Sequence, residues 1–148
     1  MKMGNILIRD MLISDIDELS ILYYDFWHEK SDTEKMRKEF KKLINNKDYI
    51  FLSATTNDVL IGTILGIMCH ELYGNCKPFL VMEDFIVHAD YRNMGVGKKL
   101  LDKLEEVALT RGCSQIQFIT DSNRTNAIEF YKKRGYETNK HIGLKKKL

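Results

Sequence analysis

The segment from Glu83 to Lys98 constrains the fold more than any other part of this sequence. An apolar run, Phe79 to Val87, has the β-branched and aromatic residues of a buried strand. A turn with Gly95 and Gly97 follows, and a helical pattern begins at Val96. Glycine lets the backbone approach a ligand closely, and the free N–H groups at a helix N-terminus bind anions. This arrangement therefore predicts a site for a phosphate or a pyrophosphate.

Two common phosphate-binding motifs do not fit this segment. A P-loop needs glycine where Arg92 stands and serine or threonine where Lys99 stands. A dinucleotide-binding fingerprint needs a third glycine at Leu100, and it normally opens the first strand–helix–strand unit of its domain. What remains is the pattern R-x-x-G-x-G, from Arg92 to Gly97, at the end of an apolar strand.

The rest of the chain changes between helical and strand patterns and predicts one α/β domain over residues 1–148. Strands are predicted for Ile6–Arg9, Tyr49–Thr55, Val59–Cys69, Phe79–Val87 and Gln115–Thr120, with an edge strand in His141–Leu148. Helices are predicted after a Ser14 cap, after the Ser31 to Glu34 capping signal, from Val96 to a C-cap at Gly112, and over Asn126–Lys133, which Gly135 ends. This order predicts a mixed sheet covered by helices.

Composition argues against several other classes of protein. The 148 residues carry 23 Lys and Arg against 21 Asp and Glu, a balance that does not predict a nucleic-acid partner. The three cysteines and four histidines lack the short spacings of metal ligands, so we expect no metal. Cys113 follows the helix-ending Gly112 and has no paired histidine nearby in sequence, so we expect no covalent role for it. Since no leader pattern or long apolar stretch occurs, we expect a cytoplasmic protein without a membrane partner.

The R-x-x-G-x-G pattern resembles the acetyl-coenzyme A signature of the GNAT family of N-acetyltransferases. A second segment, Asn126 to Tyr136, is similar to the family's late helix, with A-x-x-x-Y followed by x-x-x-G and an aromatic residue. The family fold implies a mixed central sheet of about six to seven strands flanked by four helices. Within the family, the segments 83–92 and 130–135 look most like diamine (spermidine/spermine) acetyltransferases. The sequence departs from the family at one cofactor contact, because the usual family asparagine is Arg124 here, with Asn123 and Asn126 on either side.

The resemblance implies an acetyl-CoA-dependent N-acetyltransferase in which a primary amine attacks the thioester directly, in a ternary complex. The amine, with a pKa of about 10.4, must lose a proton, and the departing thiolate must gain one. The resemblance selects Glu83 as the proton acceptor, directly or through water, and Tyr131 as the proton donor. It implies a cofactor site made of Phe85, Ile86, Val87, Arg92, Asn93, Met94, Gly95, Val96, Gly97, Lys98, Asn123, Asn126, Tyr131 and Arg134.

The acceptor is less constrained than the reaction. Contacts with the substrate are expected from Tyr24, Trp27, Glu83 and Asp84, because aromatic and acidic side chains suit a small cationic amine such as a polyamine or diamine. In a regular strand only one of the two carboxylates can face the amine, unless a bulge intervenes. An aminoglycoside, a protein N-terminus, a lysine or an unusual metabolite stays open as acceptor. A coenzyme A-binding module without turnover is the alternative to an enzyme. The family makes a homodimer plausible.

Overall fold

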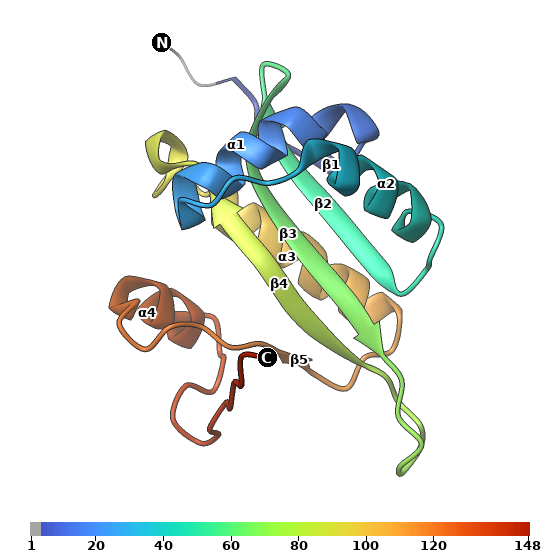
Figure 1. Ribbon diagram of the computed structural model, residues 1–148. Helices are drawn as coiled ribbons and strands as arrows, with labels where there is room; N and C mark the ends of the chain where they lie inside the picture. The colour runs from blue at the N-terminus through green and yellow to red at the C-terminus, as the bar shows by residue number, and fades with distance from the viewer. Residues whose placement is uncertain (1–3) are drawn as a thin grey trace. The chain divides into compact units, whose positions relative to one another are not determined.

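The computed structural model describes residues 4–148 and contains a mixed sheet of five strands in the order β1-β2-β3-β4-β5 (Figure 1). The strands are β1 (Leu7–Asp10), β2 (Tyr49–Thr56), β3 (Val59–Cys69), β4 (Phe79–Val87) and β5 (Ile116–Gln117). Neighbours from β1 to β4 are antiparallel, whereas β5 runs parallel to β4. The predicted mixed sheet is confirmed, although it has five strands where six to seven were expected.

Residues 4–148 contain four α-helices, the number predicted. They are α1 (Ile16–Trp27), α2 (Thr33–Leu43), α3 (Val96–Thr110) and α4 (Thr125–Lys133), and two short 3-10 turns lie at Ile13–Asp15 and Ala89–Tyr91. The chain forms two compact units, of which the first ends at Gln117 and the second is Phe118–Leu148. In the first unit, α1 and α2 cover one face of the sheet and α3 covers the other (Figure 1).

Each face of the sheet has its own core. On the α1 face, the β4 residue Ile86 belongs to a buried cluster with Leu19 and Leu22 of α1. On the α3 face, Leu104 lies so close to β3 that a Cβ atom on Gly66 would stand 2.6 Å from its Cδ1 atom. Glycine at position 66 therefore lets α3 pack directly against the strand.

The start of α1 differs from the prediction. Neither the 3-10 turn nor α1 has a side-chain cap, so the expected cap from Ser14 is wrong. Instead the carboxylate of Asp15 accepts hydrogen bonds from the backbone N–H of Leu12 (2.9 Å) and the hydroxyl of Ser53 (3.0 Å), and it pairs with both guanidinium nitrogens of Arg9 (2.7 and 2.8 Å). Burial, the largest single influence, favours a higher pKa for Asp15, but these hydrogen bonds together lower it.

The other helix ends follow their predicted signals. The carboxylate of Asp32 accepts from the backbone N–H of Lys35 (3.0 Å) and caps α2. Gly112 follows α3 and Gly135 follows α4, both with positive φ (74° and 88°), as C-terminal glycines do.

The last two predicted strands are wrong in length or in kind. The strand expected over Gln115–Thr120 is reduced to the two residues of β5. The edge strand expected in His141–Leu148 does not form, and Ile142 and Leu144 are 89% and 90% exposed. A strand also needs a regular ladder of backbone hydrogen bonds to a neighbouring segment, and among residues 4–148 the alternating segment forms no such ladder.

Candidate active site

A bulge interrupts β4 at the two carboxylates. Between the paired positions Leu65↔Glu83 and Thr63↔Ile86, β4 contains one residue more than β3. Asp84 sits in this bulge with a φ of 50°, a left-handed conformation that residues other than glycine rarely adopt. Bulges of this kind redirect side chains, and they are common beside active sites.

The bulge places both carboxylates on the α1 face of the sheet. Leu80 lies beside Gly66 on the α3 face, and regular alternation from Leu80 turns Glu83 to the opposite side. Asp84 faces the same side, because its carboxylate accepts a hydrogen bond from the hydroxyl of Tyr23 in α1. The bulge is the exception to regular alternation, and it places both acidic groups on the same face of β4.

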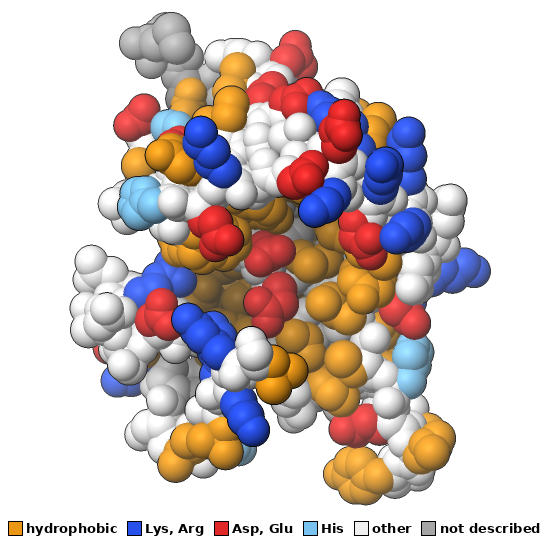
Figure 2. Space-filling model, viewed as in Figure 1, with side chains coloured by type: hydrophobic (Ala, Val, Ile, Leu, Met, Phe, Trp, Pro, Cys, Tyr) orange, Lys and Arg blue, Asp and Glu red, His pale blue; other side chains and the backbone are white. Residues whose placement is uncertain are grey.

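The two carboxylates differ in their surroundings. Glu83 is exposed, whereas Asp84 is partly buried and lies 3.4 Å from the Tyr23 hydroxyl. Burial raises the pKa of the Asp84 carboxyl, and the hydrogen bond from Tyr23 acts in the opposite direction. Figure 2 shows acidic side chains among hydrophobic ones over the middle of the sheet. The two carboxylates thus lie on one face of the strand but differ in exposure.

Aromatic side chains of α1 surround the Tyr23 contact. The rings of Tyr23 and Trp27 lie 5.1 Å apart, and Trp27 contacts Phe26 edge-on at 5.3 Å. Trp27 stays 46% exposed and can therefore meet a ligand. Of the substrate contacts expected from α1, Trp27 is the one that the structure joins, through Tyr23, to Asp84. The contact between Tyr23 and Asp84 itself was not predicted.

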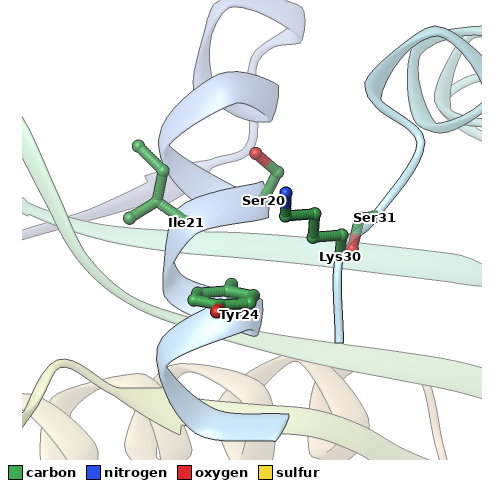
Figure 3. Close-up of a pocket in the computed structure, with 5 residues that line it drawn as sticks. All are labelled: Ser20, Ile21, Tyr24, Lys30 and Ser31. Atoms are coloured by element: carbon green, nitrogen blue, oxygen red, sulfur yellow. The ribbon is translucent and has the colours of Figure 1, made fainter. Parts of the chain in front are cut away.

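Tyr24 belongs to a separate depression on α1. A cavity of about 280 Å³ lies between α1 and the segment that leads to α2 (Figure 3). Its lining residues are Ser20, Ile21, Tyr24, Lys30 and Ser31. The ring of Tyr24 meets the ring of His28 edge-on at 6.5 Å. The structure therefore places the two predicted aromatic contacts, Tyr24 and Trp27, in different surroundings.

One edge of β4 is open next to the bulge. β5 pairs with β4 only at Leu80 and Val81, and no strand among residues 4–148 pairs with that side of β4 farther along. His88 donates its backbone N–H to Ile61 of β3 (2.9 Å). Because hydrogen-bonding directions alternate along an antiparallel strand, the N–H of Val87 points toward the open edge.

The turn before α3 lies exposed, as the predicted pyrophosphate loop requires. Gly95 has a φ of 83°, and in the described chain the backbone N–H groups of residues 93–98 donate to no backbone carbonyl. The side chains are less available. Arg92 donates its Nε–H to the carbonyl of Val87 (3.1 Å), and Lys98 pairs with Asp102 (2.8 Å). An anion at this turn would therefore be bound mainly by backbone N–H groups.

The first turn of α3 also contacts β4. A Cβ atom on Gly97 would stand 3.4 Å from Cζ of Phe85 and 3.7 Å from Cγ2 of Val87. Both of these predicted cofactor contacts therefore lie beside the predicted loop. Ile86 differs, because its side chain is 2% exposed and belongs to the core on the α1 face, which leaves only its backbone for a ligand.

The second unit holds the predicted proton donor in an aromatic cluster. The ring of Tyr131 contacts the rings of Phe118 (4.6 Å), Phe130 (5.5 Å) and Tyr136 (5.8 Å). Burial raises the pKa of the Tyr131 phenol, although the charge of Arg124 acts in the opposite direction. The phenol therefore keeps its proton at neutral pH, as a proton donor must.

The remaining predicted contacts of the second unit lie around α4. Asn123 precedes the helix, Asn126 is in its first turn, and Arg134 follows it with its guanidinium 5.8 Å from the ring centre of Phe130. Arg124, at the usual family asparagine, is the residue before α4, and it donates from Nη1 to the hydroxyl of Thr120 (3.4 Å).

Comparison with known proteins decides the family. Residues 15–136 match the model of the acetyltransferase (GNAT) family. The chain belongs to the GNAT family. An acetyltransferase of Yersinia pestis (strain Pestoides F) is 27% identical over 143 residues, which are 95% of this chain and 94% of that protein. A second relative, an N-acetyltransferase of Yersinia pestis, is also 27% identical over 143 residues. The enzyme class predicted from the sequence, an N-acetyltransferase, agrees with the family and with the names of both relatives.

Solved structures share the fold of this GNAT family member. A transcriptional regulator from Bacillus halodurans C-125 superposes with a TM-score of 0.89 at 23% identity, over 97% of this chain and 100% of that one. An aminoglycoside N-acetyltransferase in complex with CoA superposes with a TM-score of 0.81 at 17% identity, over 99% and 97% of the two chains. At these identities the likeness establishes the fold alone.

Three further observations bear on the expected partners of this GNAT protein. No helix among residues 4–148 is long and apolar enough to cross a membrane. In the same residues no three His, Cys, Asp or Glu side chains are grouped as metal ligands would be. Cys69, Cys76 and Cys113 are free thiols, and burial raises the pKa of Cys113.

Proposed function

We propose that this GNAT protein transfers the acetyl group of acetyl-CoA to a primary amine that attacks the thioester directly. The observation that carries the proposal is the open edge of β4 at the bulge, next to a turn whose backbone N–H groups are exposed. An extended pantetheine arm can add to such an edge as a strand does, and a pyrophosphate can accept hydrogen bonds from such a turn.

The expected holding residues fit the shape of coenzyme A. The N–H groups of residues 93–98 would bind the pyrophosphate, with the left-handed Gly95 shaping the turn. Phe85 and Val87 would line the path of the pantetheine, and Asn123, Asn126 and Arg134 are proposed as cofactor contacts from the family resemblance. Acetyl-CoA supplies an activated acyl group when it is bound.

The residues of the chain then have three tasks. The carboxylate of Glu83 accepts the proton of the ammonium, directly or through water, because a protonated amine has no lone pair for attack. The N–H of Val87, which points toward the open edge, donates to the thioester oxygen. Tyr131, whose phenol stays protonated, gives a proton to the departing thiolate.

The proposed acceptor is a small cationic amine, such as a polyamine or diamine. The support is the pair of carboxylates that the bulge places on one face, together with the partly exposed Trp27 near Asp84. Carboxylates attract an ammonium group by charge, and the face of an indole attracts it by the cation–π interaction.

The experiment is a measurement of free thiol released from acetyl-CoA with a panel of amines: polyamines, aminoglycosides, lysine and short peptides. We expect release with at least one amine, and a loss of kcat of about 100-fold or more in Tyr131→Phe. Tyr136→Phe, which removes a hydroxyl from the same aromatic cluster, is the matched control and should keep its activity. Tight binding of acetyl-CoA without release on any amine would instead identify a coenzyme A-binding module.

A further inference from the structure

The hydrogen bond between Tyr23 and Asp84 joins a core residue of α1 to an acidic group of the site. Tyr23 packs against the buried cluster of the α1 face, and its ring contacts Trp27. The position of its hydroxyl is therefore fixed by the core. That hydroxyl lies 3.4 Å from Oδ2 of Asp84, across 61 positions of sequence.

The tyrosine donates in this pair when Asp84 is ionised, because an ionised carboxylate only accepts hydrogen bonds. Burial raises the pKa of Tyr23, and the negative charge of Asp84 raises it further, so the phenol stays protonated at physiological pH. A fixed donor orients the Asp84 carboxylate and uses one of its oxygen atoms, while the other oxygen remains available to a ligand.

We propose that Tyr23 is a positioning residue that holds Asp84 as the anchor for the acceptor's ammonium group, so that recognition of the acceptor depends on pH. The inference rests on the proposed function. Asp84 binds the cation in its ionised form, and Glu83 is left to accept the proton of the reacting amine. Tyr23 thus becomes part of the acceptor site, and the two carboxylates have separate tasks.

The direction of the pH dependence follows from the groups that face Asp84. The Tyr23 hydroxyl contacts Asp84 from α1, the carboxylate of Glu83 lies on the same face of β4, and the opposing β3 residues Thr63, Ile64 and Leu65 carry no charge. Burial raises the pKa of Asp84, and donation from Tyr23 lowers it. Removal of the donor must therefore raise this pKa, so that Asp84 loses its charge at a higher pH than before.

The test is the substitution Tyr23→Phe, which keeps the ring in the core and removes only the hydroxyl. For a cationic amine that the wild type acetylates, we expect KM at neutral pH to rise about fivefold, the equivalent of one hydrogen bond. We expect KM for acetyl-CoA and kcat to change less than twofold. The acid limb of kcat/KM for the amine should move up by about half a pH unit. Tyr49→Phe, on β2 and outside the site, is the matched control.

A titration without turnover keeps this inference separate from the proposed function. Carbon-13 NMR titration of the Asp84 carboxyl, with Asp84→Asn to assign the signal, needs no turnover and should show a higher pKa in Tyr23→Phe than in the wild type. An unchanged pKa, or an unchanged KM for the amine together with an unmoved acid limb, overturns the role of Tyr23. Absence of amine acetylation by the wild type would overturn the proposed function and, with it, Asp84 as an acceptor anchor, even if the NMR shift is present.

Discussion

Replacement of Gly97 with alanine should weaken the binding of acetyl-CoA without weakening the fold. Gly97 is the second residue of α3, where the backbone is helical. The added methyl group would lie 3.4 Å from Cζ of Phe85 and 3.7 Å from Cγ2 of Val87, which are ordinary contact distances. Alanine is better than glycine in a helix by up to about 1 kcal/mol. The free energy of unfolding should therefore stay the same or rise by no more than about 1 kcal/mol.

The same methyl group lies where we propose that the ligand passes. It would stand between the first turn of α3 and the side chains at the open edge of β4, and would keep the pantetheine from close approach to the backbone. We expect the Kd for acetyl-CoA to rise about tenfold, which corresponds to about 1.4 kcal/mol of binding free energy. Calorimetric titration with acetyl-CoA and urea unfolding of the same samples measure the two quantities separately.

Gly66→Ala gives the converse result and serves as the control. Its methyl group would stand 2.6 Å from Cδ1 of Leu104, so the core must shift, at a cost of about 1–3 kcal/mol of stability. The affinity of the folded protein for acetyl-CoA should not change, because Gly66 lies in β3, outside the proposed site. If Gly97→Ala is as stable as expected but binds acetyl-CoA with the Kd of the wild type, the reasoning about the first turn of α3 is refuted.

Two further predictions concern the core. Asp15→Asn should lower the free energy of unfolding by about 3 kcal/mol, because it breaks the ion pair with Arg9. The loss is smaller to the extent that solvent screens the partly exposed Arg9. The pKa of Asp15 is lower in the folded protein, so the carboxylate stabilises the fold above pH about 4, and this stabilisation is lost as the pH falls through the folded pKa. In urea unfolding at decreasing pH, the wild type should therefore lose this stability, whereas Asp15→Asn should not. Leu104→Ala should cost about 2–5 kcal/mol alone, and the double substitution with Gly66→Ala should cost less than the sum, because the new methyl group enters the space that Leu104 leaves. Additive costs in urea unfolding would contradict this.

Local patterns in the sequence predict most elements of the first unit. The limits of β3 and β4 agree with the prediction, because each is a long apolar run with a turn at both ends. The cap at Asp32 and the glycine at position 112 also act as predicted, since both signals depend on neighbours within a few residues. The family resemblance places the glycine turn before α3 correctly, and the structure leaves its backbone N–H groups exposed.

What the sequence does not predict depends on distant parts of the chain. The bulge at Asp84 arises from the pairing of β4 with β3, and no residue in the run from Met82 to Val87 is a glycine that would mark it. The hydroxyl of Tyr23 and the carboxylate of Asp84 meet only after the sheet and α1 have packed. Ile86 lies beside residues of the site in sequence, yet strand alternation points its side chain into the core on the α1 face.

The length of β4 exceeds what the core needs by one residue. If Asp84 were deleted, Leu80 and Met82 would keep their positions toward α3, and Ile86 would keep its position toward α1, in a strand without interruption. Deletion of one residue from a regular strand would instead turn every later side chain of that strand to the opposite face of the sheet. Insertion or deletion of this acidic residue can therefore occur during evolution without a change in the packing of the hydrophobic core.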